Sequence, residues 1–343
     1  VSTMNNIIEN VFASERLAGW EGLGLAVQAY QKRGIAVVDW CIDLANHYSK
    51  KLMVRLVKGA YWDTEIKLAQ EEGLAGYPVY TRKAATDVSY LVCAKKLLAA
   101  KQQIYPQFAS HNAHTVASIM SMAQGCEFEF QCLHGMGQAL YQTVVKQHQI
   151  PCRIYAPVGG HDTLLAYLVR RLLENGANTS FVNRIVDSRT TVADLIADPA
   201  SFLKQLPIKP HPRIPLPHDL YGMHRKNAVG IDLSDANVLA ALKDAMKSSR
   251  KTPWQACPTM SRWCAKGVQI VTSPTTGEKV GEMQWASIEQ VDEIMAHAVT
   301  AFASWQHEPL ENRVAILRKV ADKIEQDMPG IMAMLADEAG KTL

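Results

Sequence analysis

Two adjacent arginines in a helical segment are the first residues whose types suggest chemistry. Arg170 and Arg171 lie in the apolar-periodic segment 164–175, which Gly176 ends. A guanidinium group matches a carboxylate with two parallel hydrogen bonds, so these residues could clamp a small anion. The alternative is a solvated helix face on which Glu174 forms ion pairs with them. Neighbouring helical positions diverge by about 100°, so one arginine could grip a substrate while the other is structural.

A cation inside an apolar segment is the second candidate. Arg55 interrupts the apolar run 52–57, and burying it requires an anionic or hydrogen-bonding partner. That partner could be a ligand or a carboxylate on a neighbouring strand. Gly59 follows, where a ligand could approach the backbone closely. Tyr155 ends another short apolar run, so it could face a site or only fill the rim of the core.

Three histidines raise the question of a metal site. His111 and His114 are three residues apart, and His134 follows a later strand. No carboxylate or cysteine completes a ligand shell at this spacing. We therefore expect no metal and read a histidine at a strand end as a hydrogen-bonding or stacking group.

Short apolar runs alternate with helical segments between residues 22 and 203, and these elements must position the candidates. The predicted strands are 22–27, 52–57, 104–109, 128–133 and 152–156. The predicted helices are 37–45, 63–72, 84–100, 116–123 and 164–175. Near-continuous apolar strands that alternate with helices indicate an α/β fold with a parallel sheet. Polar or glycine-containing residues follow each strand, which is typical of the (β/α)₈ barrel, whose chemistry lies at that edge.

The alternative is a doubly wound sheet, but no Gly-x-Gly-x-x-Gly follows a strand. Only five strands are visible, and residues 2–17 read as a helix. We therefore expect the second half of a barrel, with three strands upstream of Val1. An incomplete barrel leaves sheet edges unpaired, so we expect this chain alone to be inactive or nearly so.

The chain changes character after the predicted barrel. Five prolines between residues 207 and 217 disfavour helix and central strand. A hairpin over 269–271 and 279–283 then precedes helices at 287–305, 311–327 and 328–339. We expect a partial barrel at 1–204, a proline-rich linker and connecting segment at 205–260, and a further domain at 261–343.

Composition narrows the class of protein. The chain has 343 residues, 48% of them hydrophobic and 20% charged, which indicates a globular protein. A net charge of +3 is too small to support DNA binding. Seven cysteines without a Cys-x-x-Cys pair indicate reduced thiols, and no run of about 18 apolar residues predicts a membrane span. We expect a cytoplasmic protein, with peripheral attachment to the inner face of the plasma membrane left open.

Several segments together resemble a known family. They are Arg55–Trp62 (RLVKGAYW), 76–83 (GYPVYTRK), 108–114 (FASHNAH), 130–136 (FQCLHGM) and 167–175 (YLVRRLLEN). They resemble the proline dehydrogenase barrel and, more closely, the bifunctional proline utilisation A family. The segment from about residue 268 is similar to the opening of an aldehyde dehydrogenase domain, which follows the barrel in that family.

The resemblance implies FAD at the carboxyl edge of the barrel and hydride transfer from L-proline to the flavin N5, giving Δ1-pyrroline-5-carboxylate. Arg55 and Tyr155 would be catalytic positions. Proline would be bound by Arg170, Arg171 and Tyr167. The cofactor would be contacted by Gln28, Lys58, Gly59, Ala60, Trp62, Thr81, Ser110, His111 and Glu174.

The resemblance also implies partners. Electrons would pass to a membrane quinone, the whole enzyme would be a homo-oligomer, and its second domain would oxidise glutamate semialdehyde to glutamate with NAD. The family's catalytic Lys and Asp, its nucleophilic Cys and the general-base Glu of the second domain have no counterpart here. Two alternatives stay open: a non-catalytic scaffold, and another barrel enzyme that binds a small anionic substrate.

Overall fold

The chain divides into two compact units. In the computed structural model, the described residues are 2–176, 184, 187–223, 225–250, 253–258 and 267–342. The N-terminal unit comprises residues 1–71 and 76–220, and the C-terminal unit comprises residues 72–75 and 221–343.

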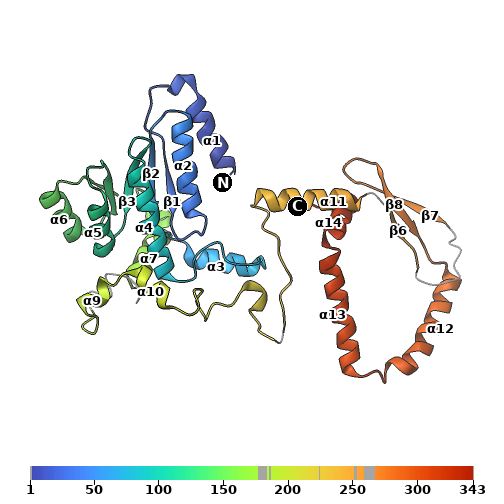
Figure 1. Ribbon diagram of the computed structural model, residues 1–343. Coiled ribbons are helices and arrows are strands. Elements are labelled where there is room, and N and C mark those ends of the chain that lie inside the picture. The colour runs from blue at the N-terminus through green and yellow to red at the C-terminus, as the bar shows by residue number, and fades with distance from the viewer. Residues whose placement is uncertain are drawn as a thin grey trace. The chain divides into compact units, whose positions relative to one another are not determined.

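A five-stranded parallel sheet forms the centre of the N-terminal unit (Figure 1). Its strands are β1 (Gly24–Gln28), β2 (Leu52–Val57), β3 (Ile104–Ala109), β4 (Glu129–Leu133) and β5 (Cys152–Tyr155). They lie in the order β1-β2-β3-β4-β5, and each pairs in parallel with the next. A doubly wound sheet would reverse its order at a switch point. The predicted parallel α/β sheet is therefore confirmed, and it is wound in one direction, as in a barrel.

Helices follow the strands along the chain. They are α1 (Ser2–Ala13), η1 (Glu15–Leu17), α2 (Gly34–His47), α3 (Trp62–Glu71), α4 (Lys83–Ala99), α5 (Ala113–Met122), α6 (Gln138–His148), α7 (His161–Gly176), α9 (Val192–Leu195), α10 (Pro199–Gln205) and η2 (Pro217–Asp219). Helix α6 was not predicted from the sequence. Its buried residues are Tyr141 and Val144, which is too few for a clear helical period.

Alternation along the strands separates two faces of the sheet. Leu52, Val54 and Leu56 of β2 are buried, and they share one core with residues of α2, α4 and α5. The intervening positions of each strand point to the opposite face. That second face, which we call the inner face, carries Arg55, Gln107, Glu129, Gln131, Arg153 and Tyr155, as the strand register requires.

The proline-rich segment after α10 is held against the N-terminal unit. The Arg82 guanidinium donates to the carbonyl oxygens of Ile208, Lys209 and Pro210 at 3.3, 2.9 and 3.1 Å. The Thr81 hydroxyl accepts from the His211 amide at 3.0 Å. The buried Tyr77 hydroxyl donates to the Pro215 carbonyl at 2.6 Å. Side chains therefore bind the backbone of a segment that forms neither helix nor sheet.

The C-terminal unit contains a small sheet and four helices among its described residues. Its elements are α11 (Ala236–Ser249), β6 (Trp254–Ala256), β7 (Val268–Thr272), β8 (Lys279–Gln284), α12 (Ile288–Trp305), α13 (Leu310–Gln326) and α14 (Met328–Ala339). The predicted hairpin is β7–β8, and the unpredicted β6 pairs in parallel with β8. Leu242, Met246 and Ala333 join α11 to α14 in a small core. Residues 261–266 of the predicted third segment lie outside the described residues.

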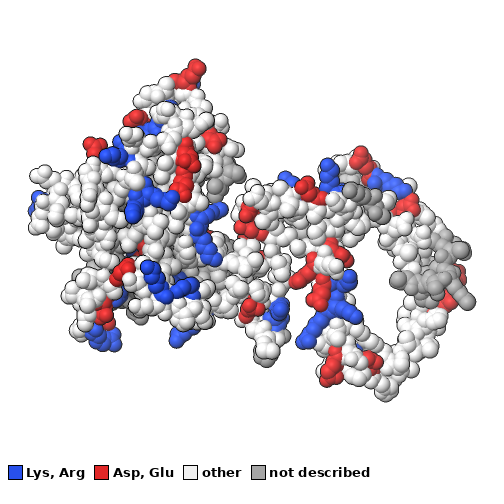
Figure 2. Space-filling view, in the orientation of Figure 1, with Lys and Arg blue, Asp and Glu red and all other residues white. Residues whose placement is uncertain are grey.

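Charged side chains of both signs are interspersed on the face shown in Figure 2, as a net charge of +3 over 343 residues suggests. None of the described helices is long and apolar enough to cross a membrane.

Candidate functional site

The carboxyl ends of the five parallel strands meet at one edge of the sheet, and most of the predicted residues lie there. Gln28 ends β1 beside Val57, the last residue of β2. Lys58 follows β2, Ser110 follows β3, and Tyr155 ends β5. Because the strands are parallel, residues far apart in sequence come to one edge.

Arg55 and Tyr155 lie together on the inner face. The Arg55 guanidinium carbon is 5.6 Å from the centroid of the Tyr155 ring, within the range of a cation–π contact. Their strands, β2 and β5, are separated by β3 and β4. The two side chains therefore meet across two intervening strands, which brings the two predicted catalytic positions together.

The loop after β2 is packed on Tyr30. Gly59 has φ +129°, and a Cβ atom there would lie 2.4 Å from the Tyr30 ring. The Tyr30 amide donates to the Lys58 carbonyl at 2.7 Å, and its hydroxyl donates to the Glu65 carboxylate at 3.2 Å. Burial, together with the Glu65 charge, raises the pKa of Tyr30 to about 12. Tyr30 is therefore a neutral ring that fixes the backbone of Gly59 and the exposed Ala60.

Helix α7 brings an arginine to the same loop. The Arg170 guanidinium carbon lies 3.9 Å from the centroid of the exposed Tyr61 ring, and Arg170 is close enough to Tyr30 to act on its pKa. The next residue, Arg171, lies over the ring of Tyr167 on its own helix at 5.1 Å. The side chain of Glu174 lies outside the described residues. Tyr61 was not among the predicted residues, although it stands within the Arg55–Trp62 motif.

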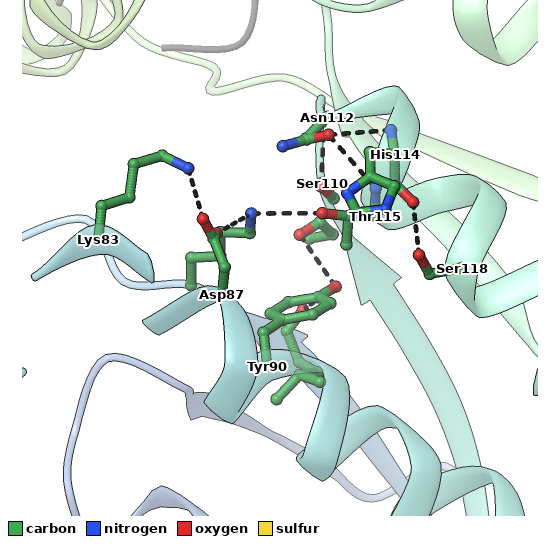
Figure 3. A network of polar contacts seen from close by, with 11 residues as sticks. Lys83, Asp87, Tyr90, Ser110, Asn112, His114, Thr115 and Ser118 are labelled. Atoms are coloured by element: carbon green, nitrogen blue, oxygen red, sulfur yellow. Dashed lines mark hydrogen bonds and ion pairs between the residues drawn. The ribbon is translucent and has the colours of Figure 1, made fainter. Parts of the chain in front are cut away.

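Lys58 is anchored by contacts from two helices, and Figure 3 shows Asp87 and Thr115, the two residues that make them. Its ammonium group donates to Asp87 of α4 at 2.5 Å and to the Thr115 hydroxyl of α5 at 3.3 Å. Asp87 also accepts from Lys83 at 2.7 Å. Burial favours the neutral carboxyl, but the ammonium groups of Lys58 and Lys83 outweigh it and hold the pKa of Asp87 below its ordinary value. Asp87 therefore carries a charge between two cations.

The loop after β3 is ordered by its own side chains. The Ser110 hydroxyl accepts from the Asn112 amide at 3.2 Å. Asn112 caps α5 by accepting from the amides of His114 and Thr115 at 2.9 and 3.3 Å, as an N-cap residue does. The Tyr141 hydroxyl of α6 donates to the Ser110 carbonyl. This loop thus positions Ser110 and the neighbouring His111.

Trp62 and Thr81 make backbone contacts away from the strand ends. The Trp62 indole donates to the Tyr80 carbonyl at 2.8 Å, which joins the loop after β2 to the loop before α4. Thr81 accepts from the proline-rich segment at His211. Its hydroxyl proton can still be donated to a ligand.

A buried carboxylate on the inner face was missed by the sequence analysis. Glu129 of β4 is 3% exposed. It accepts from Gln107 and Gln131 at 2.9 and 2.8 Å and from both arms of the Arg153 guanidinium at 2.9 Å. Burial alone would raise the pKa of Glu129, but the hydrogen bonds from Arg153 and the two glutamines outweigh burial and hold this pKa below its ordinary value. The alternation of polar and apolar residues in 129–133 could have indicated this network.

One small cavity adjoins the Lys58 network. It has a volume of about 60 Å³, and its lining includes Lys83, Asp87, Asn112, His114 and Thr115. That volume corresponds to about two water molecules, whereas small-molecule sites usually exceed about 300 Å³. Within the described part of the chain, no group of three or more His, Cys, Asp or Glu could hold a metal ion.

The chemistry of this edge fits an anionic dinucleotide and a small carboxylate. Arg55, Lys58, Arg170 and Arg171 supply positive charge. Gly59 keeps one stretch of backbone free of a side chain, where a Cβ atom could not fit. Cations beside such a backbone are the groups that bind and orient an anionic cofactor.

The chain is similar to known proteins over nearly its whole length. The proline dehydrogenase family model matches residues 2–184, and the aldehyde dehydrogenase family model matches residues 263–343. The chain is 50% identical to the bifunctional protein PutA of Klebsiella aerogenes over 98% of its length, and 49% identical to that of Escherichia coli K12. It is also similar to a crystal structure of a bifunctional proline utilization A protein, with 45% identity over 99% of this chain and a TM-score of 0.84.

The match covers only part of each relative. The chain spans 27% of the length of these curated relatives and 32% of the chain in that crystal structure.

Proposed function

The chain belongs to the proline dehydrogenase family and continues into the start of an aldehyde dehydrogenase domain. We propose that its parallel sheet contributes to the FAD-dependent oxidation of L-proline to Δ1-pyrroline-5-carboxylate. The observation that supports this most directly is the meeting of Arg55 with Tyr155 and of Arg170 with Tyr61 at one edge of the sheet.

Each arginine has a distinct task in this proposal. Arg170 and Arg171 bind the carboxylate of proline, because a guanidinium fork matches a carboxylate. They start from cation–π contacts with Tyr61 and Tyr167, which orient the guanidinium groups before a substrate arrives. Tyr155 packs against the bound proline. Arg55 stabilises negative charge that develops on the acceptor of the hydride.

FAD supplies the hydride acceptor when it is bound. Gln28 and the backbone of Gly59 and Ala60 would hold its ring system. Lys58, Thr81, Ser110 and His111 bind its polar groups. Trp62 acts through the loop that it fixes at Tyr80. Glu174 supports the arginines or the cofactor.

The remaining proposals concern the whole protein. The aldehyde dehydrogenase segment would belong to an NAD-dependent domain that oxidises glutamate semialdehyde to glutamate. A membrane quinone would accept the electrons from FAD, which would place a cytoplasmic, homo-oligomeric protein at the inner face of the bacterial plasma membrane.

A graft into a complete relative tests the activity. Residues 17–203 of this chain would replace the matching stretch of the Klebsiella aerogenes protein. Purified chimera should contain flavin, and anaerobic L-proline should bleach its absorbance. The proposed function would be contradicted by a chimera that folds and binds flavin but in which L-proline does not reduce the flavin.

The same chimera tests the substrate clamp. Arg171→Ala should raise KM for proline at least about tenfold, since a hydrogen bond between charged groups is worth roughly 1.5–3 kcal/mol. Flavin content should stay near that of the unmodified chimera. Lys96→Met, which removes a half-buried ion pair with Asp39 away from the strand ends, is the control. Loss of flavin in Arg171→Ala would move this residue from the substrate to the cofactor.

A further inference from the structure

Lys58 is a predicted cofactor residue whose charged group has a charged partner within the protein. Its ammonium group lies 2.5 Å from Asp87 and 3.3 Å from the Thr115 hydroxyl, and 5.8 Å from the centroid of the Tyr90 ring. An ammonium group has three N–H donors. Asp87 and Thr115 take two of them, which leaves one for a ligand.

We propose that Asp87 is a positioning residue of the cofactor site, which holds the Lys58 ammonium group in place to bind the diphosphate of a dinucleotide. The inference rests on the proposed function, because it assumes that Lys58 meets FAD. It adds a residue that would act through Lys58 and would not itself touch the cofactor.

The geometry explains why a lysine here needs a carboxylate. Side chains rotate freely at a lysine stem, and ordering one costs up to about 2 kcal/mol. Asp87 and Thr115 come from α4 and α5, so the ammonium group is fixed from two elements of the core. Asp87 is itself held by Lys83, one helical turn before it, at 2.7 Å. Figure 3 shows Lys83 beside Asp87, with a dashed line for the contact between them.

Asp87 also keeps the Lys58 amine protonated. Burial lowers the pKa of Lys58 below its ordinary value, and Lys83 acts in the same direction, while Asp87 raises it. Without Asp87, the amine would lose its proton at a lower pH and would then bind a diphosphate poorly.

Few other titratable groups face this lysine. Lys83, Asp87 and Tyr90 belong to α4. His114 of α5, Asp194 of α9 and Arg184 line the cavity that Asp87 also lines. Burial raises the pKa of Tyr90 well above its ordinary value. Asp87 is the group that raises the pKa of Lys58, so a pH-dependent loss of binding that Asp87→Asn introduces reports on Lys58.

The test uses the purified 343-residue chain and FAD, whose affinity is measured by flavin fluorescence between about pH 7.5 and 9.5. Asp87→Asn should weaken FAD binding about tenfold or more, since a hydrogen bond between charged groups is lost, and the loss should grow as the pH rises. Asp87→Glu should restore most of the affinity. Lys83→Met removes the other cation on the same carboxylate and should produce no such growing loss.

Three results decide whether Asp87 positions Lys58. If Asp87→Asn binds FAD as tightly as the unmodified chain does at every pH, the inference is overturned. If the affinity of Asp87→Asn is lower by the same factor at every pH and Asp87→Glu does not restore it, Asp87 has only a structural role, and the inference is also overturned. In Lys58→Met, adding Asp87→Asn should change the affinity no further.

A second measurement keeps the inference separate from the proposed function. If the unmodified chain does not bind FAD, the same variants are compared in the chimera, and a folded chimera without flavin contradicts the assignment of Lys58 to the cofactor. Competitive labelling with acetic anhydride, read by peptide mass spectrometry, then reports the protonation of Lys58 without a cofactor. Faster labelling of Lys58 in Asp87→Asn than in the unmodified chain supports the role of Asp87, and unchanged labelling contradicts it.

Discussion

At the scale of single residues, the inner face of the sheet resolves the question of how Arg55 is accommodated. The sequence left two partners open, a ligand and a carboxylate on a neighbouring strand. The carboxylate of that face, Glu129, is bound on both oxygens by Arg153, and Arg55 lies over the Tyr155 ring. The guanidinium of Arg55 thus meets an aromatic face, an arrangement that leaves its N–H groups available to a ligand.

Removing the Glu129 charge should destabilise the N-terminal unit. Glu129→Gln should lower the free energy of unfolding at neutral pH by about 1–3 kcal/mol, because Arg153 loses its charged acceptor. Urea unfolding, combined with hydrogen exchange of peptides from β3 to β5, measures the loss. Asp39→Asn removes the half-buried ion pair with Lys96, whose two side chains keep much of their contact with water, and should cost no more than about 1 kcal/mol.

The effect should depend on pH in one direction. The folded-state pKa of Glu129 lies below its ordinary value of 4.5, so its contribution is complete above that value. It is lost as the pH falls through the folded-state pKa. The difference between Glu129→Gln and the unmodified chain should therefore shrink at acid pH. A difference that stays constant down to acid unfolding would show that the charge is not responsible.

At the scale of elements, the strands were the most predictable part of the fold. Strands 52–57 and 104–109 were predicted with the bounds that the structure has, because each is an apolar run between helices. The helix α6 was missed because it buries few residues. The short β6 was missed because a three-residue strand has no period of its own and depends on its pairing with β8.

The loop after β2 carries the prediction at this scale. Gly59→Ala should lower the free energy of unfolding of the N-terminal unit by about 1–3 kcal/mol from backbone strain alone, because a residue with a side chain is strained at φ +129°. Overlap of the new Cβ atom with the Tyr30 ring adds to this cost. Thermal unfolding measures this cost. Gly76→Ala is the matched control, since a Cβ atom at Gly76 would have nothing within 4 Å. Equal midpoints for the two variants would contradict the role of Tyr30.

At the scale of the whole molecule, contacts between distant parts of the sequence redefine the proline-rich segment. The prolines predicted an extended linker. Arg82 binds three consecutive carbonyl groups of this segment, which lie 126 to 128 residues away in sequence. Since the neighbouring Thr81 binds His211, this segment borders a residue proposed to contact the cofactor.

Arg82→Met should release this segment. Peptides that cover residues 205–217 should exchange their amide hydrogens faster, and a protease should cut there sooner, because three hydrogen bonds are lost. Arg33→Met, at an exposed arginine that bonds to Gln31, should leave both rates unchanged. Unchanged exchange in Arg82→Met would mean that the remaining contacts at Thr81 and Tyr77 hold the segment by themselves.

The α/β class, the five strands of the parallel sheet and the resemblance to a proline dehydrogenase followed by an aldehyde dehydrogenase segment could all be predicted from the sequence. Periodicity and local motifs are encoded in neighbouring residues, so they can be read without coordinates. The fold was needed to show that Arg55 meets Tyr155, that Asp87 and Thr115 hold Lys58, and that Glu129 binds three side chains. These contacts join residues between 2 and 100 positions apart across four strands and two helices, and they depend on strand order and register, which no local pattern specifies.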